Sequence, residues 1–165
     1  MDYLKLIQSR IITDENLEAL LTYWRFKDEK IVFTNGCFDL LHRGHVEYLA
    51  QAAGLGSVLI LGLNSDQSVR KIKGDQRPIQ DEYSRALLTA SLHFVSGVKL
   101  FDEETPYNLI SRILPDVLVK GSDYREEDIV GADVVKQHGG QVVTIDFTDG
   151  YSSSGIIDKI RQSHS

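Results

Sequence analysis

Cysteine is almost absent from this sequence, which has one, Cys37, among 165 residues. A single cysteine excludes an intrachain disulfide and fits a reducing cytosol. Long apolar stretches are missing too: no uncharged run approaches the roughly 18 residues of a membrane span, and residues 1–10 lack the apolar core of a signal peptide. No internal repeat, low-complexity tract or interdomain linker stands out. The sequence therefore predicts one globular domain in the cytoplasm, without a membrane partner.

Excess positive charge is also missing. Lys and Arg number 18 against 24 Asp and Glu, which gives a formal net charge of −6 at pH 7 and a pI near 5.3. A nucleic-acid binder normally presents a basic face that neutralises phosphates, so we expect no nucleic-acid partner. A small phosphorylated substrate needs only a few cations and backbone N–H groups, and it is compatible with this charge.

Short apolar runs alternate with segments of helical periodicity. The runs predict buried strands at 31–34, 57–63, within 94–101, 116–120 and 141–146. The periodic segments predict helices at 13–27, 45–55, 81–92, 105–114, 126–138 and 152–161, whereas the polar stretch 64–78 predicts a mobile loop. This alternation indicates a single Rossmann-like α/β domain, with a five-stranded parallel sheet and helices on both faces.

The expected division of the chain is an N-terminal helical segment, 1–29, packed on a domain formed by 30–165. The helix at 13–27 could pack on its own domain or on a partner chain, so a homodimer is left open. Right-handed crossovers place ligands at the carboxyl ends of the strands. The turns there are also the most distinctive segments of the sequence: 35–39, 64–66, 121–123 and 149–152.

The most specific motif runs from the strand 31–34 through a glycine turn into the start of a helix. His42 and His45 stand three residues apart at that start, so their imidazoles can lie on one face. Free backbone N–H groups and the helix dipole favour an anion there. Gly44 removes a side chain where a phosphate would approach the backbone. The motif therefore predicts a phosphate site.

The histidine pair also has two simpler explanations. A zinc half-site needs completing ligands, and one cysteine with His93, His138 and His164 offers no clear set. We therefore expect no protein-bound metal. A pair of solvated histidines is common for such a spacing alone, but the full string from Asn35 to His45 is too specific for that explanation.

Four stretches carry a resemblance to a known family: 31–45 (IVFTNGCFDLLHRGH), 58–78, 114–124 (LPDVLVKGSDY) and 149–157 (DGYSSSGII). Together they resemble the HxGH nucleotidylyltransferases, and within that family the D-glycero-β-D-manno-heptose 1-phosphate adenylyltransferases. The histidine pair marks only the wider superfamily, whereas 34–39 and 120–124 mark this branch. The resemblance covers roughly residues 30–161.

The resemblance implies catalytic roles for His42, His45 and Lys73, which would bind and neutralise the phosphates of ATP. It implies a nucleotide-binding set of Thr34, Asn35, Gly36, Cys37, Phe38, Gly44, Arg85, Gly121, Asp123, Tyr124, Ser152, Ser153 and Ser154. The expected acceptor-binding residues stand in the turns after the first two of the five strands: Asp39, Asn64 and Asp66.

Several of these residues also have plainer roles open to them. The cations in 70–77 could be a solvated basic loop rather than a closing phosphate clamp. Arg85 could form a surface salt bridge, and the serines at 152–154 could cap the last helix. Asp39 could cap the helix of the histidines, or orient the acceptor or Mg²⁺. Cys37 has no base partner by spacing, so it is interpreted as packing rather than as a nucleophile.

The reaction that the resemblance implies is attack of a sugar 1-phosphate on the α-phosphorus of ATP, accompanied by Mg²⁺, to give an ADP-sugar and pyrophosphate. The acceptor phosphate is already a nucleophile, so positioning and charge stabilisation suffice. One alternative is a cytidylyltransferase acting on glycerol 3-phosphate or a similar alcohol phosphate, but Phe147 stands where those enzymes place an arginine. Another is a non-catalytic nucleotide-binding module, which the intact histidines and Lys73 disfavour.

Overall fold

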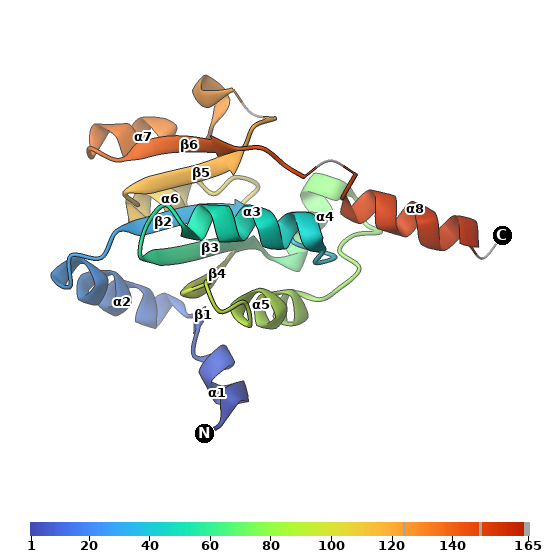
Figure 1. Ribbon diagram of the computed structural model, residues 1–165, viewed down its shortest axis with the longest axis horizontal. Helices are drawn as coiled ribbons and strands as arrows, with labels where there is room; N and C mark the ends of the chain where they lie inside the picture. The colour runs from blue at the N-terminus through green and yellow to red at the C-terminus, as the bar shows by residue number, and fades with distance from the viewer. Residues whose placement is uncertain (124, 149, 164–165) are drawn as a thin grey trace.

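The computed structural model describes residues 1–123, 125–148 and 150–163. Its elements, in chain order, are α1 (Tyr3–Gln8), β1 (Ile11–Ile12), α2 (Asp14–Phe26), β2 (Ile31–Gly36), α3 (Arg43–Ala53), β3 (Val58–Asn64), α4 (Asp66–Lys73), α5 (Glu82–Ala90), β4 (Gly97–Phe101), α6 (Tyr107–Ile113), β5 (Val117–Gly121), the 3₁₀ turn η1 (Glu126–Asp128), α7 (Ala132–Gln137), β6 (Gln141–Ile145) and α8 (Ser153–Ser163). Within the described residues, six parallel strands form one sheet in the order β1-β4-β3-β2-β5-β6 (Figure 1).

The single α/β domain with a parallel sheet is confirmed, but the predicted number of five strands is wrong. The five predicted strands are β2 to β6. The sixth strand in the described chain, β1, pairs Ile11 with Val98 and Ile12 with Lys99 of β4 at the sheet edge. Two residues are too few to show a periodicity, so the pattern could not reveal this strand. The division of the chain at residue 29 stays a prediction.

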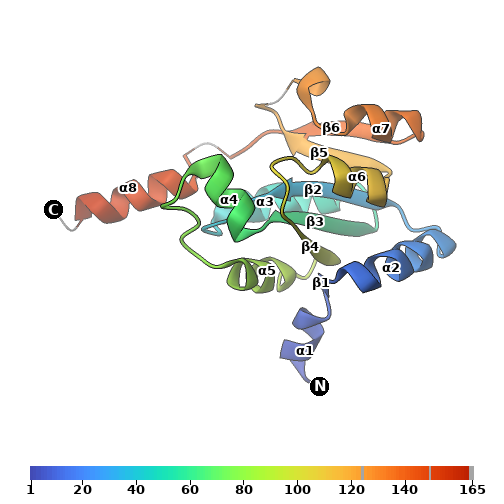
Figure 2. The same cartoon turned by 180° about the vertical axis from the view of Figure 1, so that it is seen from behind.

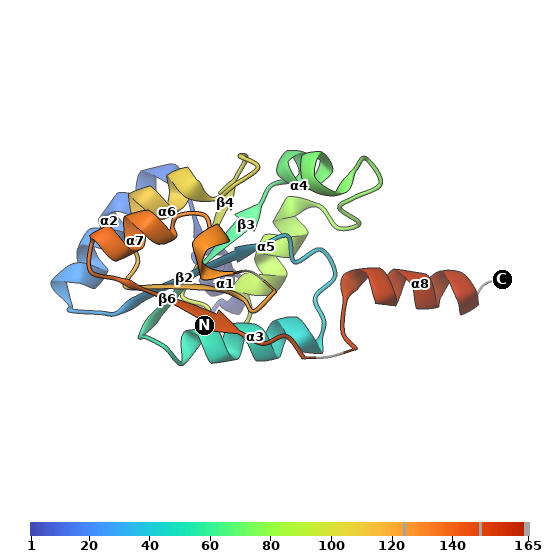
Figure 3. The ribbon, with the colours of Figure 1, turned by 90° about the horizontal axis from the view of Figure 1, so that it is seen from above.

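Helices cover both faces of the sheet, because alternate residues of a strand point to opposite sides. Ile31 and Phe33 of β2 belong to a core cluster with α2, α6 and α7. Val32, which lies between them, packs with α3 and α5 on the other face. Figure 3 separates α6 and α7 from α3 on opposite sides of the sheet, and Figure 2 shows α2 and α6 on the near side. Leu17 and Leu21 of α2 are buried in the cluster that contains Ile31 and Phe33, so that face of the helix packs on its own domain.

Two other expectations about local structure are wrong. The loop predicted at 64–78 contains α4, which Ser65 caps by accepting the N–H of Ser68 at 3.2 Å. Four of the eight residues of α4 are charged, so its apolar positions are too sparse to show a helical period. The helix predicted at 126–138 is instead η1 followed by α7. Gly131, with a φ of 83°, separates the two in a conformation that suits glycine.

The carboxyl ends of the strands face α4 and the start of α8 (Figure 1). No side chain of α8 is buried, and the helix extends away from the body of the domain (Figure 3). In the described part of the chain, every helix is too short or too polar to cross a bilayer.

Candidate active site

A cavity of about 440 Å³ opens at the carboxyl ends of the central strands. The chain runs outward from β2 to β3 and β4, then returns to place β5 on the other side of β2. A crevice at such a reversal is where open α/β sheets bind ligands. Among the residues predicted from the sequence, the lining includes Asn35, Gly36, Cys37, Phe38, Asp39, His45, Asn64, Lys73, Gly121, Asp123 and Ser153. The structure therefore gathers most of the predicted site at one edge of the sheet.

The two motif histidines stack at the start of α3, with ring centroids 3.7 Å apart and planes 18° from parallel. His42 is the N-cap: its Nδ1 accepts the backbone N–H of His45 at 3.3 Å. Because Nδ1 accepts this bond, the neutral ring of His42 carries its proton on Nε2. His45 borders the cavity and contacts the Phe38 ring, at a centroid distance of 4.9 Å. The predicted shared face is therefore present as a stacked pair of rings.

Both imidazoles are neutral at physiological pH. Burial lowers the pKa of His45 to about 4; the adjacent His42 and the ammonium of Lys73 act in the same direction, and the backbone of Leu40 opposes them. Burial also lowers the pKa of His42. A neutral imidazole donates one N–H, so each ring can offer one hydrogen bond to a phosphate oxygen.

Gly44 stands between the histidines with little free space around it. A Cβ there would lie 3.2 Å from Nδ1 and Cε1 of His42 and 3.2 Å from Cβ of Tyr151. Gly36, in the turn before, is similarly confined, because its Cβ would come within 2.7 Å of the Phe38 ring. In this structure the glycines leave room for the aromatic rings of the site itself.

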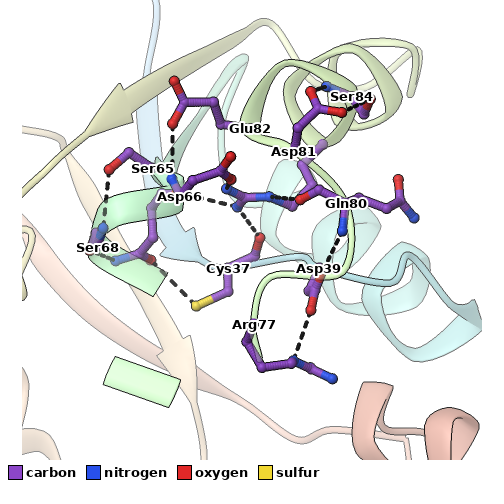
Figure 4. A network of polar contacts seen from close by, with 12 residues as sticks. Cys37, Asp39, Ser65, Asp66, Ser68, Arg77, Gln80, Asp81, Glu82 and Ser84 are labelled. Atoms are coloured by element: carbon purple, nitrogen blue, oxygen red, sulfur yellow. Dashed lines mark hydrogen bonds and ion pairs between the residues drawn. The ribbon is translucent and has the colours of Figure 1, made fainter. Parts of the chain in front are cut away.

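Arg85 lies beneath the site rather than in it. Its side chain is buried, and it donates to the carbonyls of Cys37 at 2.7 Å, Asn64 at 2.8 Å and Gln80 at 3.0 Å. The third guanidinium nitrogen, Nη2, forms an ion pair with Asp66 at 2.8 Å. Three of its partners, Cys37, Asp66 and Gln80, are labelled in Figure 4. Through these contacts Arg85 joins the turns after β2 and β3 to the segment before α5. Arg85 is therefore not a surface salt bridge, and it does not line the cavity; its predicted contact with the nucleotide stays a prediction.

Asp39 borders the cavity, but its oxygens are already engaged. Oδ1 accepts the N–H groups of Ile79 at 2.7 Å and Gln80 at 3.0 Å, and Oδ2 lies 2.9 Å from Nε of Arg77 in an ion pair (Figure 4). His42, not Asp39, caps α3. The carboxylate thus ties the segment after α4, and with it Lys73 at the end of α4, to the turn that precedes the histidines.

The other two predicted acceptor residues differ in position. Asn64 lines the cavity, where its amide donates to Ser68 at 2.9 Å and accepts weakly from the Cys37 thiol at 3.9 Å. Asp66 does not line it and is committed to Arg85. Burial raises the pKa of the Cys37 thiol, which disfavours a thiolate and agrees with a packing role.

Thr34 and the serines at the start of α8 complete the predicted set. Thr34 is buried and bonds to the hydroxyl of Tyr48 at 2.8 Å, so it supports the site from below. Ser152 accepts the N–H of Gly155 at 3.0 Å, as a capping residue does. Ser153 lines the cavity, while Ser154 borders a separate hollow with Lys73 and Arg77.

The segment after β5 lies on the opposite wall. Gly121 lines the cavity beneath Phe147, and a Cβ on this glycine would overlap the Phe147 ring. Asp123 also lines it, whereas Tyr124 is outside the described residues. The sequence reasoning assigned no role to Lys120, which lines the same wall and donates to the Asn35 side chain. Its position directly before the Gly121 turn, at the end of an apolar run, was the signal that could have found it.

No protein cage for a metal is formed by the described residues, which contain no cluster of three or more His, Cys, Asp or Glu side chains suited to one. The oxygens of Asp39, the carboxylate considered for this role, are held by two amides and an arginine. The described residues therefore do not fit a resident metal ion.

Neutral N–H donors at a helix start, with an ammonium group nearby at the reversal point of a parallel sheet, are groups suited to binding phosphate oxygens. Residues 33–159 match the family model of cytidylyltransferase-like proteins. The chain belongs to the cytidylyltransferase-like family, which confirms the predicted class of enzyme, a nucleotidylyltransferase.

Relatives and a solved structure agree with this assignment. The bifunctional protein HldE of Campylobacter jejuni subsp. doylei is 51% identical over 161 residues, 98% of this chain and 32% of the relative. The same protein of Geobacter metallireducens is 51% identical over 150 residues, 91% of this chain and 31% of the relative. The chain thus spans about a third of their length. The crystal structure of the lipopolysaccharide core biosynthesis protein from Thermoplasma volcanium matches with a TM-score of 0.61 and 28% identity, over 73% of this chain and 99% of that one.

Proposed function

We propose that this chain transfers AMP from ATP to a sugar 1-phosphate, D-glycero-β-D-manno-heptose 1-phosphate, and releases pyrophosphate. The stacked pair of His42 and His45 beside the cavity is the observation that carries the proposal. The similarity to a lipopolysaccharide core biosynthesis protein supports an ADP-heptose product used for that core. The acidic net charge of −6 supports small-molecule substrates rather than a nucleic acid.

In the proposed reaction, an oxygen of the acceptor phosphate attacks the α-phosphorus of ATP in line. The bond from that phosphorus to the oxygen bridging to the β-phosphate breaks, and the electron pair leaves with pyrophosphate. No proton has to be removed from the acceptor, which agrees with histidines that are neutral donors rather than bases. His42 and His45 donate to the α- and β-phosphates, and Lys73 at the rim neutralises the β- and γ-phosphates.

The serines at the start of α8 and the turn at the end of β2 supply the remaining nucleotide contacts. The position of Ser153 and of residues 35–38 in the lining of the cavity supports this assignment. Mg²⁺ enters as part of the substrate MgATP, held by its phosphates, since Mg²⁺ binds by substrate phosphates rather than by dedicated protein cages. A cytoplasmic location supplies ATP and fits the single cysteine.

Pyrophosphate release with ATP and the heptose phosphate tests the proposal. We expect turnover by the wild type, and about a 100-fold or greater loss in His45→Ala, because one donor to transition-state charge contributes 10²–10³ in rate. Circular dichroism of the variant checks that the fold persists. Near-full turnover by His45→Ala would contradict the assigned role.

The two alternatives give different readouts in the same assay. A cytidylyltransferase would release pyrophosphate with CTP and glycerol 3-phosphate, although the aromatic Phe147, stacked on Tyr48 at a centroid distance of 5.2 Å, offers no cation to CTP. A non-catalytic module would bind ATP without releasing pyrophosphate for any acceptor. Light scattering on the purified protein tests whether it forms the homodimer that the sequence leaves open.

A further inference from the structure

Lys120 bridges the two strands between which the order of the sheet reverses. It is the penultimate residue of β5, and its ammonium donates to the side-chain oxygen of Asn35 at the end of β2. Both residues line the cavity. The reversal point is the place where this class of sheet binds its ligands. The fold thus sets a cation, already held by an amide, into the ligand crevice.

The cavity has two ammonium groups in different surroundings. Among the described residues that line it, the lysines are Lys73 and Lys120, and no arginine lines it. Lys73 is the last residue of α4 and lines the cavity with His45, whose pKa its charge helps to lower. Lys120 instead feels the carboxylate of Asp123. The two cations therefore belong to two subsites, one beside the histidines and one at the end of β5.

Two phosphate-bearing substrates must bind in the proposed reaction, and the acceptor still needs a cation. Two of the three residues expected to bind the acceptor, Asp39 and Asp66, are carboxylates whose partners are Arg77 and Arg85. A carboxylate would in any case repel a phosphate dianion. Lys73 is assigned to the leaving phosphates of ATP. This leaves Lys120 as the cavity cation without an assigned substrate.

We propose that Lys120 binds the phosphate of the acceptor, the sugar 1-phosphate, and holds it for attack on the α-phosphorus. The inference rests on the proposed function and adds a residue to it. Asn35 orients the ammonium in the free protein. Burial lowers the pKa of Lys120 to about 8, with Asp123 opposing the shift, so the group is mainly protonated at pH 7. An incoming phosphate compensates the poor solvation of this buried cation.

Calorimetric titration of the full chain with D-glycero-β-D-manno-heptose 1-phosphate, in the presence of a non-reacting α,β-methylene analogue of ATP, tests the inference. Lys120→Met should weaken acceptor binding by about 10- to 100-fold, the range expected for a hydrogen bond to a charged group. The affinity for the ATP analogue should stay within about 3-fold. Lys120→Arg should recover part of the acceptor affinity, because it restores the charge without the compact shape of the ammonium.

Lys27→Met is the matched control, since it removes the same charge from an exposed lysine at the end of α2. It should leave both affinities unchanged. Unchanged acceptor affinity in Lys120→Met would overturn the inference, as would an equal or larger loss for the ATP analogue. If Lys120→Met does not fold, as judged by circular dichroism, Lys120→Arg decides. In that case the inference is overturned if Lys120→Arg binds the acceptor as tightly as the wild type does. It is also overturned if the loss of acceptor affinity in Lys120→Arg is no larger than the loss of affinity for the ATP analogue.

Failure of the proposed function looks different. It appears in the wild type, which would then neither bind the heptose phosphate nor release pyrophosphate with it. The same titration of wild type and Lys120→Met with glycerol 3-phosphate would then judge the phosphate contact by itself. An equal affinity of both proteins for that acceptor overturns the role of Lys120, and a selective loss in the variant supports it.

Discussion

Replacement of Arg85 by methionine should destabilise the fold more than it weakens nucleotide binding. The guanidinium donates to three carbonyls and to the carboxylate of Asp66, at distances of 2.7 to 3.0 Å. Methionine fills much of the volume but leaves these oxygens without their donor. Removal of one partner of a buried ion pair costs about 3–5 kcal/mol. Because Asp66 keeps 23% of its side-chain surface exposed, water can solvate it, and we expect the lower half of that range.

Urea unfolding, followed by the fluorescence of Trp24, measures this loss. With a slope of about 2 kcal/mol/M, a loss of about 3–4 kcal/mol lowers the midpoint by about 1.5–2 M at constant slope. Arg85→Lys should give an intermediate loss, because an ammonium cannot reproduce the planar fork of donors. Arg112→Met is the control: this arginine also donates to three oxygens, of Asp14 and Glu18, but 39% of its side chain is exposed. Its loss should be about 1 kcal/mol or less.

The opposite result would refute the reasoning. If Arg85→Met unfolded at nearly the wild-type midpoint and instead bound ATP at least tenfold more weakly, Arg85 would be a nucleotide contact. That outcome would restore the role that the family resemblance implied. Equilibrium binding of ATP is measured for both proteins without urea, at a temperature at which both are folded. This measurement separates the loss of stability from a loss of nucleotide affinity.

The remaining predictions concern the phosphate site. The pKa of His45, about 4 in the folded protein, lies below its ordinary value of 6.5, so the contribution of the neutral ring to stability is full above pH 6.5 and is lost as the pH falls toward 4. Between pH 7 and pH 5, the free energy of unfolding should therefore fall by about 1 kcal/mol less in His45→Gln than in the wild type. Parallel pH profiles of the two proteins would contradict this. Lys73→Met should lower kcat about 100-fold in the pyrophosphate assay. The melting temperature should change little, because the side chain is exposed. A rise in KM alone would mean that Lys73 binds the substrate and the transition state equally well. Gly44→Ala should displace the His42 ring, which a Cβ would approach to 3.2 Å, and lower kcat about tenfold while the midpoint of unfolding changes little; unchanged kcat would show that the rings tolerate the methyl.

Sequence reasoning succeeded where a pattern is long or chemically specific. The apolar runs of β2 to β6 predicted the parallel sheet, and residues 35–38 and His45, which the motif brought together, line one cavity. The strand β1 and the helix α4 escaped because two residues, or a short polar helix, carry too little periodicity. Tertiary pairing with β4 and the cap by Ser65 fix them instead.

Charged residues were the hardest to interpret from the sequence. Arg85 and Asp39 look like ligand contacts in a sequence, because charged side chains are seldom fully buried. In the structure they are buried and hold the turns on which the site stands. Lys120 shows the opposite difference between sequence and structure. It follows an apolar run, which suggests a place in the sheet alone, and yet it lines the cavity. Burial and partner geometry, which depend on the whole fold, decide these cases.

The central claim is transfer of AMP to a heptose phosphate, and one competition reaction tests it most directly. The wild-type chain is incubated with equal concentrations of ATP, CTP, D-glycero-β-D-manno-heptose 1-phosphate and glycerol 3-phosphate, and the products are identified by mass spectrometry. We expect ADP-D-glycero-β-D-manno-heptose as the dominant product, with an equal amount of pyrophosphate. CDP-glycerol as the dominant product, or the absence of any nucleotide-linked product, would contradict the account.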